Sequence, residues 1–363
     1  MGWDDILGHD SVRDRFEACH RNNRLANTYL FVGMPGIGKR RFALELAKAL
    51  LCETNETSLE ACGTCPACVQ VTSEAHPDLI LVSKPADKNF IPVESFLGDR
   101  EHRRREGLCH DINLTPFSGK RKVAIIDDAD FLNAESANSL LKTLEEPPKN
   151  SLLILIGSSE HRQLQTIVSR SQVVRFSSLS MVQILEILNG LEMPGEVDAR
   201  KLAHACGGSV ELALLLDNKE LFEFRLELFG RLASLDPADN GFAKTVCDFV
   251  DAQSKEGAVK RRFQRCLGDF SIQFYDGLIQ RMLNPNATEK MEPDVLEYCE
   301  RILGAQTMFP GALESLAANC IERTMVFQRQ VDANLAMANS VPSWLNDLGK
   351  LSRNELVIAL DQI

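Results

Sequence analysis

The stretch that decides the fold of this chain is Gly33-Met34-Pro35-Gly36-Ile37-Gly38-Lys39-Arg40. It has the spacing G-x-x-x-x-G-K, and the β-branched, aromatic and apolar residues 28–32 before it predict a buried strand. Apolar residues at helical spacing in 41–51 predict a helix after it. A glycine loop between a strand and a helix holds phosphate through backbone N–H groups and the helix dipole. The expected phosphate-binding residues are Gly33, Pro35, Gly36, Gly38 and Lys39.

The position after the lysine departs from this motif. It is normally Ser or Thr, whose hydroxyl binds Mg²⁺, and here it is Arg40. A guanidinium has donors only and cannot ligate a metal ion. The sequence therefore predicts an impaired ATP/Mg²⁺ site, and it leaves open whether the chain binds ATP at all. A glycine turn in an unrelated α/β protein is the alternative, but it does not account for the lysine and both flanking elements.

The composition is that of an ordinary globular protein. At 363 residues, with 44% hydrophobic and 25% charged residues, the chain has material for two or three domains. It has no run of about eighteen apolar residues and no signal-peptide pattern, so we expect no membrane segment and a cytoplasmic location. The eleven cysteines are spread along the chain, as in a reducing compartment. The net charge of −11 argues against a stand-alone nucleic-acid binder, because phosphate neutralisation needs a basic surface.

Four cysteines lie close together in the sequence: Cys52, Cys62, Cys65 and Cys68. Two overlapping C-x2-C units and one outlying thiol can close a tetrahedral four-sulfur site, which predicts structural Zn²⁺ with no open position for catalysis. Reduced thiols in a small core are the alternative, but the surrounding residues are polar. An iron–sulfur cluster is a further option, although the ferredoxin spacing is incomplete. We interpret His76 as a turn residue, with exchange for a cysteine ligand left open, and the other cysteines as buried or idle thiols.

A second nucleotide motif follows at residues 123–128. Apolar residues 123–126 ending at Asp127 predict a buried parallel strand with a carboxylate at its C-terminal edge, where ligands of α/β proteins bind. Asp127 is placed to hold Mg²⁺ through water. The next position is usually Glu in ATPases, and here it is Asp128, whose shorter side chain would misplace the attacking water.

Three further elements complete the predicted sheet domain. Residues 134–146 have the spacing of a helix that must end before Pro147-Pro148. Residues 152–156 predict another buried strand, and Ser158 after it can donate to a terminal phosphate. Residues 173–176 predict the last strand. The predicted fold class is therefore α/β, with a parallel sheet around the phosphate loop.

The string Leu140-Leu141-Lys142-Thr143-Leu144-Glu145-Glu146-Pro147-Pro148, joined to Ser169-Arg170-Ser171, resembles bacterial clamp-loader subunits of the AAA+ superfamily. The resemblance extends from the N-terminus to the vicinity of residue 215 and includes the four-cysteine insertion. It implies an arc of related subunits, with ATP between neighbours, that opens a sliding clamp and places it around primed DNA. The implied partners are gamma/tau and delta subunits, the sliding clamp, and primed DNA reached through the assembly. The family also implies that Arg170 reaches a neighbour's nucleotide site, where a guanidinium stabilises the transferring phosphoryl group.

Three departures from the family pattern favour its delta prime type over gamma/tau motors. Arg40 replaces the metal-binding hydroxyl, Asp128 replaces Glu, and Glu211 stands where a sensor arginine is expected. We therefore predict a delta-prime-like stator of a DNA polymerase III holoenzyme, nucleoid-associated, with Arg170 as its catalytic residue acting in trans. A gamma/tau-like ATPase is the alternative, and a stand-alone zinc-dependent nucleic-acid binder is a third hypothesis. No polymerase site is visible.

The predicted domains are an AAA+ P-loop domain at 1–176 with its zinc module at 52–68, a small helical lid at 177–216, and an all-helical collar at 217–363. Helix breaks are expected near Asp236-Pro237, Asn284-Pro285-Asn286 and Phe309-Pro310-Gly311. The basic runs at 103–105 and 260–262 are interpreted as solvated faces. The sequence assigns no role to the stretch 98–110, and it gives neither ring position nor partner surfaces.

Overall fold

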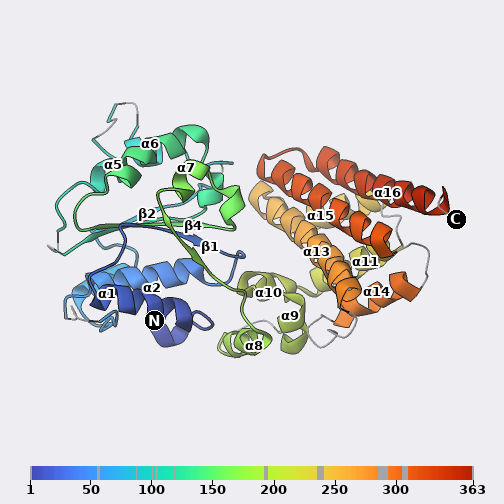
Figure 1. Cartoon of the computed structure of the whole chain (residues 1–363), viewed down its shortest axis with the longest axis horizontal. Coiled ribbons are helices and arrows are strands. Elements are labelled where there is room, and N and C mark those ends of the chain that lie inside the picture. The colour runs from blue at the N-terminus through green and yellow to red at the C-terminus, as the bar shows by residue number, and fades with distance from the viewer. Residues whose placement is uncertain are drawn as a thin grey trace. The chain divides into compact units, whose positions relative to one another are not determined.

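The computed structural model describes residues 2–54, 58–86, 88–99, 101–102, 105–117, 120–191, 195–234, 241–284, 293–304 and 310–361. Contacts among its residues divide it into two compact units, drawn in Figure 1. The α/β unit comprises Met1–Gly190 and Gly208–Glu211, and the helical unit comprises Leu191–Gly207 and Leu212–Ile363. The finer division, with a lid at 177–216 and a collar at 217–363, stays a prediction.

The α/β unit is built on a parallel sheet of five strands in the order β2-β3-β4-β1-β5. The strands are β1 (Thr28–Val32), β2 (Leu79–Val82), β3 (Lys122–Ile126), β4 (Ser151–Gly157) and β5 (Gln172–Arg175). Every residue of β1, β3 and β4 is buried, as expected of parallel strands covered on both faces. The four strands predicted from the sequence are confirmed, with ends that differ by at most one residue.

The strand order brings three functional segments to one edge of the sheet. β4 lies between β1 and β3, and all three strands run in the same direction. The residues that follow them therefore meet at the carboxyl edge, where α/β sheets bind their ligands. These are the glycine loop after Val32, the carboxylates after Ile126, and Ser158 after Gly157.

Helices cover both faces of the sheet (Figure 1). On one face lie α1 (Asp10–Arg21) and α2 (Lys39–Leu51); on the other lie α5 (Leu108–Asp111), α6 (Ala134–Glu145) and α7 (Gln165–Val168). Because strand side chains alternate, Phe31 joins Phe16 and Phe42 in one core while Leu30 joins Leu140 in the other. The remaining elements of this unit are η1 (Trp3–Asp5), α3 (Pro66–Thr72), α4 (Glu94–Leu97), η2 (Ala129–Phe131), η3 (Glu160–Arg162) and α8 (Met181–Asn189).

The helical unit consists, among the residues that the structure describes, of helices alone. They are α9 (Ala199–Ala205), α10 (Val210–Leu216), whose first turn belongs to the α/β unit, α11 (Lys219–Ala233), α12 (Phe242–Gln253), α13 (Gly257–Leu283), α14 (Pro293–Gly304), α15 (Pro310–Asp332) and α16 (Met337–Asp361). α15 packs between α13 and α16, and Phe327 stacks on Trp344 with ring centroids 4.3 Å apart. The expected helical character is confirmed. The predicted breaks at Asp236-Pro237, Pro285-Asn286 and Phe309, and the basic pair Arg103-Arg104, lie outside the described residues.

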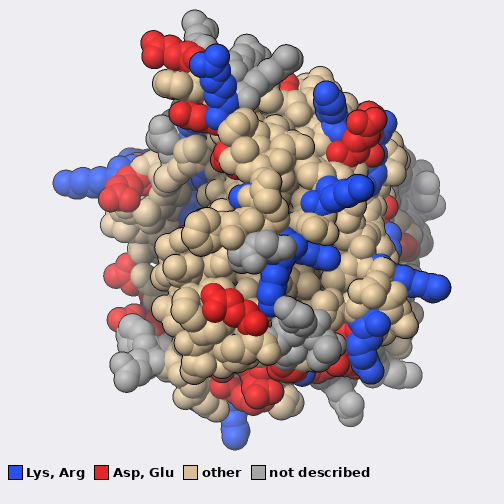
Figure 2. Space-filling view, turned by 90° about the vertical axis from the view of Figure 1, so that its left-hand side faces the viewer, with Lys and Arg blue, Asp and Glu red and all other residues tan. Residues whose placement is uncertain are grey.

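Two surface properties bear on function. Within the described part of the chain, no helix combines the length and the apolar character needed to span a bilayer. Figure 2 shows one face of the α/β unit, on which Lys and Arg side chains stand among Asp and Glu side chains. This mixture agrees with the net charge of −11 and does not form the unbroken basic surface that a stand-alone nucleic-acid binder uses.

Candidate nucleotide loop, metal centre and surface arginine

The glycine loop adopts a backbone that only glycine accommodates readily. Gly36 and Gly38 have φ of 75° and 98°, and Gly38 is the residue at which α2 begins its first turn. A Cβ added to Gly36 would lie 2.3 Å from the hydroxyl of Ser209, and the Gly36 carbonyl accepts a hydrogen bond of 3.0 Å from Val210 N. The segment before α10 therefore packs directly on the loop, which fixes both in place.

Lys39 lies inside this loop. Its side chain is 6% exposed, and its ammonium donates to the carbonyls of Gly33 and Met34 at 2.6 and 2.7 Å. Burial lowers the pKa of Lys39 to about 8, while the charges of Asp130, Asp127 and Glu211 oppose that shift. The loop thus places a cation among backbone dipoles, as the phosphate-loop motif requires.

Arg40 points its guanidinium at two carboxylates. Its Nη2 donates to both carboxylate oxygens of Glu74, at 2.7 and 2.8 Å, and its Nε lies 3.4 Å from Asp127 Oδ2. Glu74 follows α3, with φ of 57°, and Asp127 follows β3. The arginine therefore joins the first turn of α2 to the acidic end of β3 and to the end of the cysteine-bearing segment.

The carboxylates after β3 have separate environments. Burial raises the pKa of Asp127, and a 3.0 Å hydrogen bond from Asp128 N and the charge of Arg40 oppose this. Burial, followed by the charge of Asp127, raises the pKa of Asp128. Asp128 also has a left-handed backbone conformation, with φ of 57°. Asp130 accepts from Ser158 N at 2.9 and 3.1 Å and from the Gln163 side chain. Sequence reasoning missed this role of Asp130, although the spacing Asp127-Asp128-Ala129-Asp130 offered a signal.

Ser158 and Glu211 both contact the loop. The Ser158 carbonyl accepts from Gly33 N at 3.2 Å, and its buried hydroxyl has no hydrogen-bond partner within the described part of the chain. The Glu211 side chain lies against Gly36, and its negative charge acts on both Lys39 and Asp127. The candidate nucleotide residues thus surround one loop, and a carboxylate faces it where the family pattern has an arginine.

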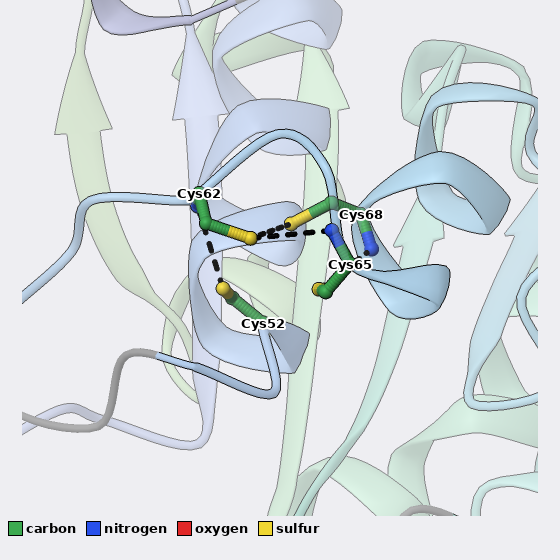
Figure 3. Close-up of side chains that lie close together, drawn as sticks. All are labelled: Cys52, Cys62, Cys65 and Cys68. Carbon is green, nitrogen blue, oxygen red and sulfur yellow. Dashed lines mark hydrogen bonds between the residues drawn. The ribbon is translucent and has the colours of Figure 1, made fainter.

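The four cysteines converge into one cluster (Figure 3). Their sulfur atoms all lie within 4.8 Å of one another, and Cys62 Sγ is 3.9 Å from Cys68 Sγ. Tetrahedral ligation at a Zn–S distance of about 2.3 Å separates sulfurs by roughly 3.8 Å, so the donor set fits a four-thiolate metal site. Cys65 caps α3 by accepting from Cys68 N at 3.4 Å, while Cys65 N donates to Cys62 Sγ at 3.3 Å. The arrangement can hold a metal ion.

The hydrogen bonds around the cluster support that function. Hydrogen bonds from Thr54, Thr64 and Cys65 lower the pKa of Cys62 to about 5, which favours the thiolate that a metal requires, while burial raises the pKa of Cys68 in the same cluster. His76 is a turn residue: its Nδ1 accepts from Asp78 N at 3.0 Å. Of the remaining cysteines, four are buried and three are half-buried: Cys206, Cys266, Cys299 and Cys320, and Cys19, Cys109 and Cys247.

Arg170 lies on the surface just after α7. Its Nε and Nη2 donate to Glu145 Oε1 at 2.9 and 2.6 Å, and its Nη1 donates to the Thr166 carbonyl at 3.1 Å and to Ser169 Oγ at 3.2 Å. Glu145 is the last residue of α6, which the prolines after it end. Sequence reasoning noted the Glu145-Glu146-Pro147-Pro148 string as a family mark but missed Glu145 as the partner of the arginine. Both Arg170 and Glu145 belong to the α/β unit.

Comparison with known proteins finds similarity to subunits of DNA polymerase III. A family model described as "DNA polymerase III, delta subunit" matches residues 8–180. The chain is 34% identical over 206 residues to DNA polymerase III subunit delta' of Bacillus subtilis, covering 57% of this chain and 58% of that protein. It is 31% identical over 222 residues to subunit tau of Escherichia coli, covering 60% of this chain and 32% of that protein.

The matched part is thus little more than half of the delta' relative and a third of the tau relative. Among solved structures, a gamma subunit-related protein from Thermotoga maritima aligns with a TM-score of 0.34 and 16% identity, over 93% of this chain and 99% of that chain. Over residues 8–180 the chain is similar to the DNA polymerase III delta subunit family, and its sequence relatives include delta' and tau subunits of DNA polymerase III.

Proposed function

We propose that this chain is a delta-prime-type stator of a clamp loader, an interaction subunit rather than a motor. The observation that carries the proposal is the guanidinium of Arg40 beside Asp127, at the position where an active loop has a hydroxyl and a metal ion. Asp128 and Glu211 add to this impairment, since one carboxylate is short and the other brings negative charge to the loop. Hydrolysis by its own site is therefore not the contribution that this chain makes.

The contribution is Arg170, acting in trans on a neighbouring subunit's ATP. A planar guanidinium matches the oxygens of a phosphoryl group and stabilises the charge that develops on them during transfer. Arg170 already presents its side chain at the surface, oriented by Glu145. The partners in this proposal are gamma/tau and delta subunits, the sliding clamp, and primed DNA reached through the assembly, in the cytoplasm near the nucleoid.

The cysteine cluster is proposed to hold structural zinc. Four thiolates complete a tetrahedral site and leave no position for water or substrate, so the metal stabilises the fold and does not take part in a reaction. The cluster joins the end of α2 to α3, because Cys52 follows the last residue of α2 while Cys65 and Cys68 belong to the start of α3.

A gamma/tau-like ATPase is the second candidate, and one observation favours it: Lys39 is present in the loop, where its ammonium donates to the carbonyls of Gly33 and Met34. This hypothesis predicts ATP hydrolysis by the isolated chain, and Lys39→Ala should abolish it. The stator hypothesis predicts no hydrolysis by the isolated chain.

The deciding experiment is ATP turnover by a loader rebuilt from gamma/tau, delta and this chain, with clamp and primed DNA present. We expect Arg170→Ala to leave assembly intact and to slow hydrolysis at the site that it serves by about 10³-fold. Arg175→Ala is the matched control, because Arg175 is an exposed arginine of β5 that pairs with Glu160. Unchanged turnover with Arg170→Ala, or failure of the chain to assemble with gamma/tau and delta, would contradict the proposal.

A further inference from the structure

The arginine that replaces the metal-binding hydroxyl is fixed by contacts from two separate segments. Glu74 binds its Nη2 through both carboxylate oxygens, and Asp127 faces its Nε at 3.4 Å. Glu74 has φ of 57°, a backbone conformation that costs energy for a residue with a side chain. The turn after α3 nevertheless directs this carboxylate at Arg40. The contact is thus part of how the cysteine-bearing segment meets the loop helix.

Mg²⁺ does not fit these residues. It requires oxygen ligands at about 2.1 Å in a nearly octahedral arrangement, and at this position the chain offers a guanidinium in place of a hydroxyl oxygen. An ion bound directly to Asp127 Oδ2 would lie within about 5.5 Å of Arg40 Nε, given the 3.4 Å contact. At that range the two cations repel each other, and Asp127 Oδ2 already faces the guanidinium.

The charges around the loop show what the arginine compensates. Asp127 and Glu74 both face Arg40, while Asp130 and Glu211 act on Lys39 together with Asp127. A carboxylate that is buried without a counter-ion is costly, and a paired guanidinium with several donors reduces that cost. Arg40 therefore supplies at Asp127 the positive charge that a divalent ion supplies in a loop with Ser or Thr.

We propose that Arg40 is the resident cation of this phosphate loop: its guanidinium takes the divalent-metal position at Asp127 and excludes Mg²⁺ from it. A phosphate group that enters the loop would then have Lys39, Arg40 and the loop N–H groups as its positive partners, without a metal ion. This inference concerns the chain's own loop and is independent of the trans role of Arg170.

The test uses the full chain with its cysteine site loaded and Mn²⁺ as the probe. Bound Mn²⁺ broadens the NMR signals of nearby backbone amides, so a titration of the labelled, deuterated protein locates binding even when it is weak. We expect the Asp127 and Asp128 amides of the wild type to be unaffected at Mn²⁺ concentrations that broaden them in Arg40→Thr. The substitution should lower the required concentration at least about tenfold, since it removes a like charge and adds a hydroxyl ligand.

The matched control is Arg41→Thr, which removes the same charge one residue later on α2, where Arg41 lies 4.0 Å from Asp5. It should behave as the wild type. Arg40→Ser is a second variant with a hydroxyl at this position, so the test does not depend on whether Arg40→Thr folds. The proposal is overturned if wild type and both Arg40 variants respond at the same Mn²⁺ concentration, or if Arg41→Thr gains as much as Arg40→Thr.

Discussion

Two arginines of the α/β unit, Arg40 and Arg170, carry the same charge, are both partly exposed and pair with carboxylates, yet their partners come from different sets of segments. Arg40 is bound from two distant parts of the chain, by Glu74 after α3 and by Asp127 after β3. Arg170 has one carboxylate partner, Glu145, and its other bonds come from its own turn. The contacts of Arg40 join three segments of its own fold, whereas those of Arg170 join its own turn to the end of α6. The comparison teaches that the partners of an arginine, rather than its motif position alone, indicate whether it acts within its chain or on another.

The largest expected effect comes from removing the metal ion proposed for the four-cysteine cluster. Its loss should change the contacts of Arg40 and leave those of Arg170 unchanged. Cys65 caps α3, and Glu74 follows that helix, so loss of the metal frees the segment that binds Arg40. For Cys65→Ser we expect metal content to fall to zero and amide hydrogen exchange in α3 and in the first turn of α2 to rise at least tenfold, or about 1.4 kcal/mol.

Exchange in α7 should stay as in the wild type, because Arg170 and Glu145 have no bond to those residues of the cysteine segment that the structure describes. Cys19→Ser is the control for a half-buried thiol of the same unit. If exchange in α7 rose as much as in α3, the two arginines would not be independent. If exchange in α2 stayed unchanged, Glu74 would not connect the cysteine segment to Arg40.

The sequence predicts the strands well and the contacts of the arginines poorly, for a physical reason. Residues 28–32, 123–126 and 152–156 are apolar runs that are buried wherever they pair, so their strand character is local information. The contact of Arg40 with Glu74 depends on the turn that gives Glu74 a φ of 57°, and nothing in the sequence around position 74 indicates that turn. The glycine loop was predictable because the spacing of its glycines and its lysine specifies the loop conformation.

Glu145 and Asp130 illustrate an intermediate case. Both lie in strings that sequence reasoning used, the first before the two prolines and the second after the acidic strand. Their partners, Arg170 and Ser158, lie in other segments of the sequence. Which segments meet depends on the order of the strands in the sheet. The four cysteines were predictable as a set, because three of them lie within one turn-and-helix segment and the spacing C-x2-C brings their sulfurs together.

A smaller effect is expected from the carboxylate partner of Arg170. Glu145→Gln keeps the shape of the side chain and removes the charge that orients the guanidinium. In the rebuilt loader we expect ATP turnover at the served site to fall about tenfold, less than with Arg170→Ala, because the bonds from Thr166 and Ser169 remain. The stability of the chain should change by less than about 1 kcal/mol, as for other exposed ion pairs.

The matched control is Glu146→Gln, which removes the neighbouring exposed charge. If Glu145→Gln and Glu146→Gln had equal effects, Glu145 would act through net charge and would not position Arg170. If Arg170→Ala slowed turnover while Glu145→Gln did not, the arginine would find its orientation from the neighbouring subunit instead.

The last effect concerns Lys39, the loop cation that titrates in an accessible range. Burial lowers the pKa of Lys39 from 10.5 to about 8 in the folded chain. Below pH 8 both states hold the proton, so the full cost of burying the charge is present. Between about pH 8 and 10.5 the unfolded state binds more protons, and stability must therefore rise with pH relative to a chain without this group.

We expect the free energy of unfolding of the wild type, minus that of Lys39→Met, to rise by about 2.5 kcal/mol across this interval. Urea denaturation followed by the fluorescence of Trp3, in a Trp344→Phe background, reports on the α/β unit alone, since Trp3 belongs to it and Trp344 to the helical unit. A difference that falls with pH would mean that the bonds to the Gly33 and Met34 carbonyls outweigh burial. Lys39 would then be stabilised in the loop by its hydrogen bonds, as Arg40 is by its carboxylate partners.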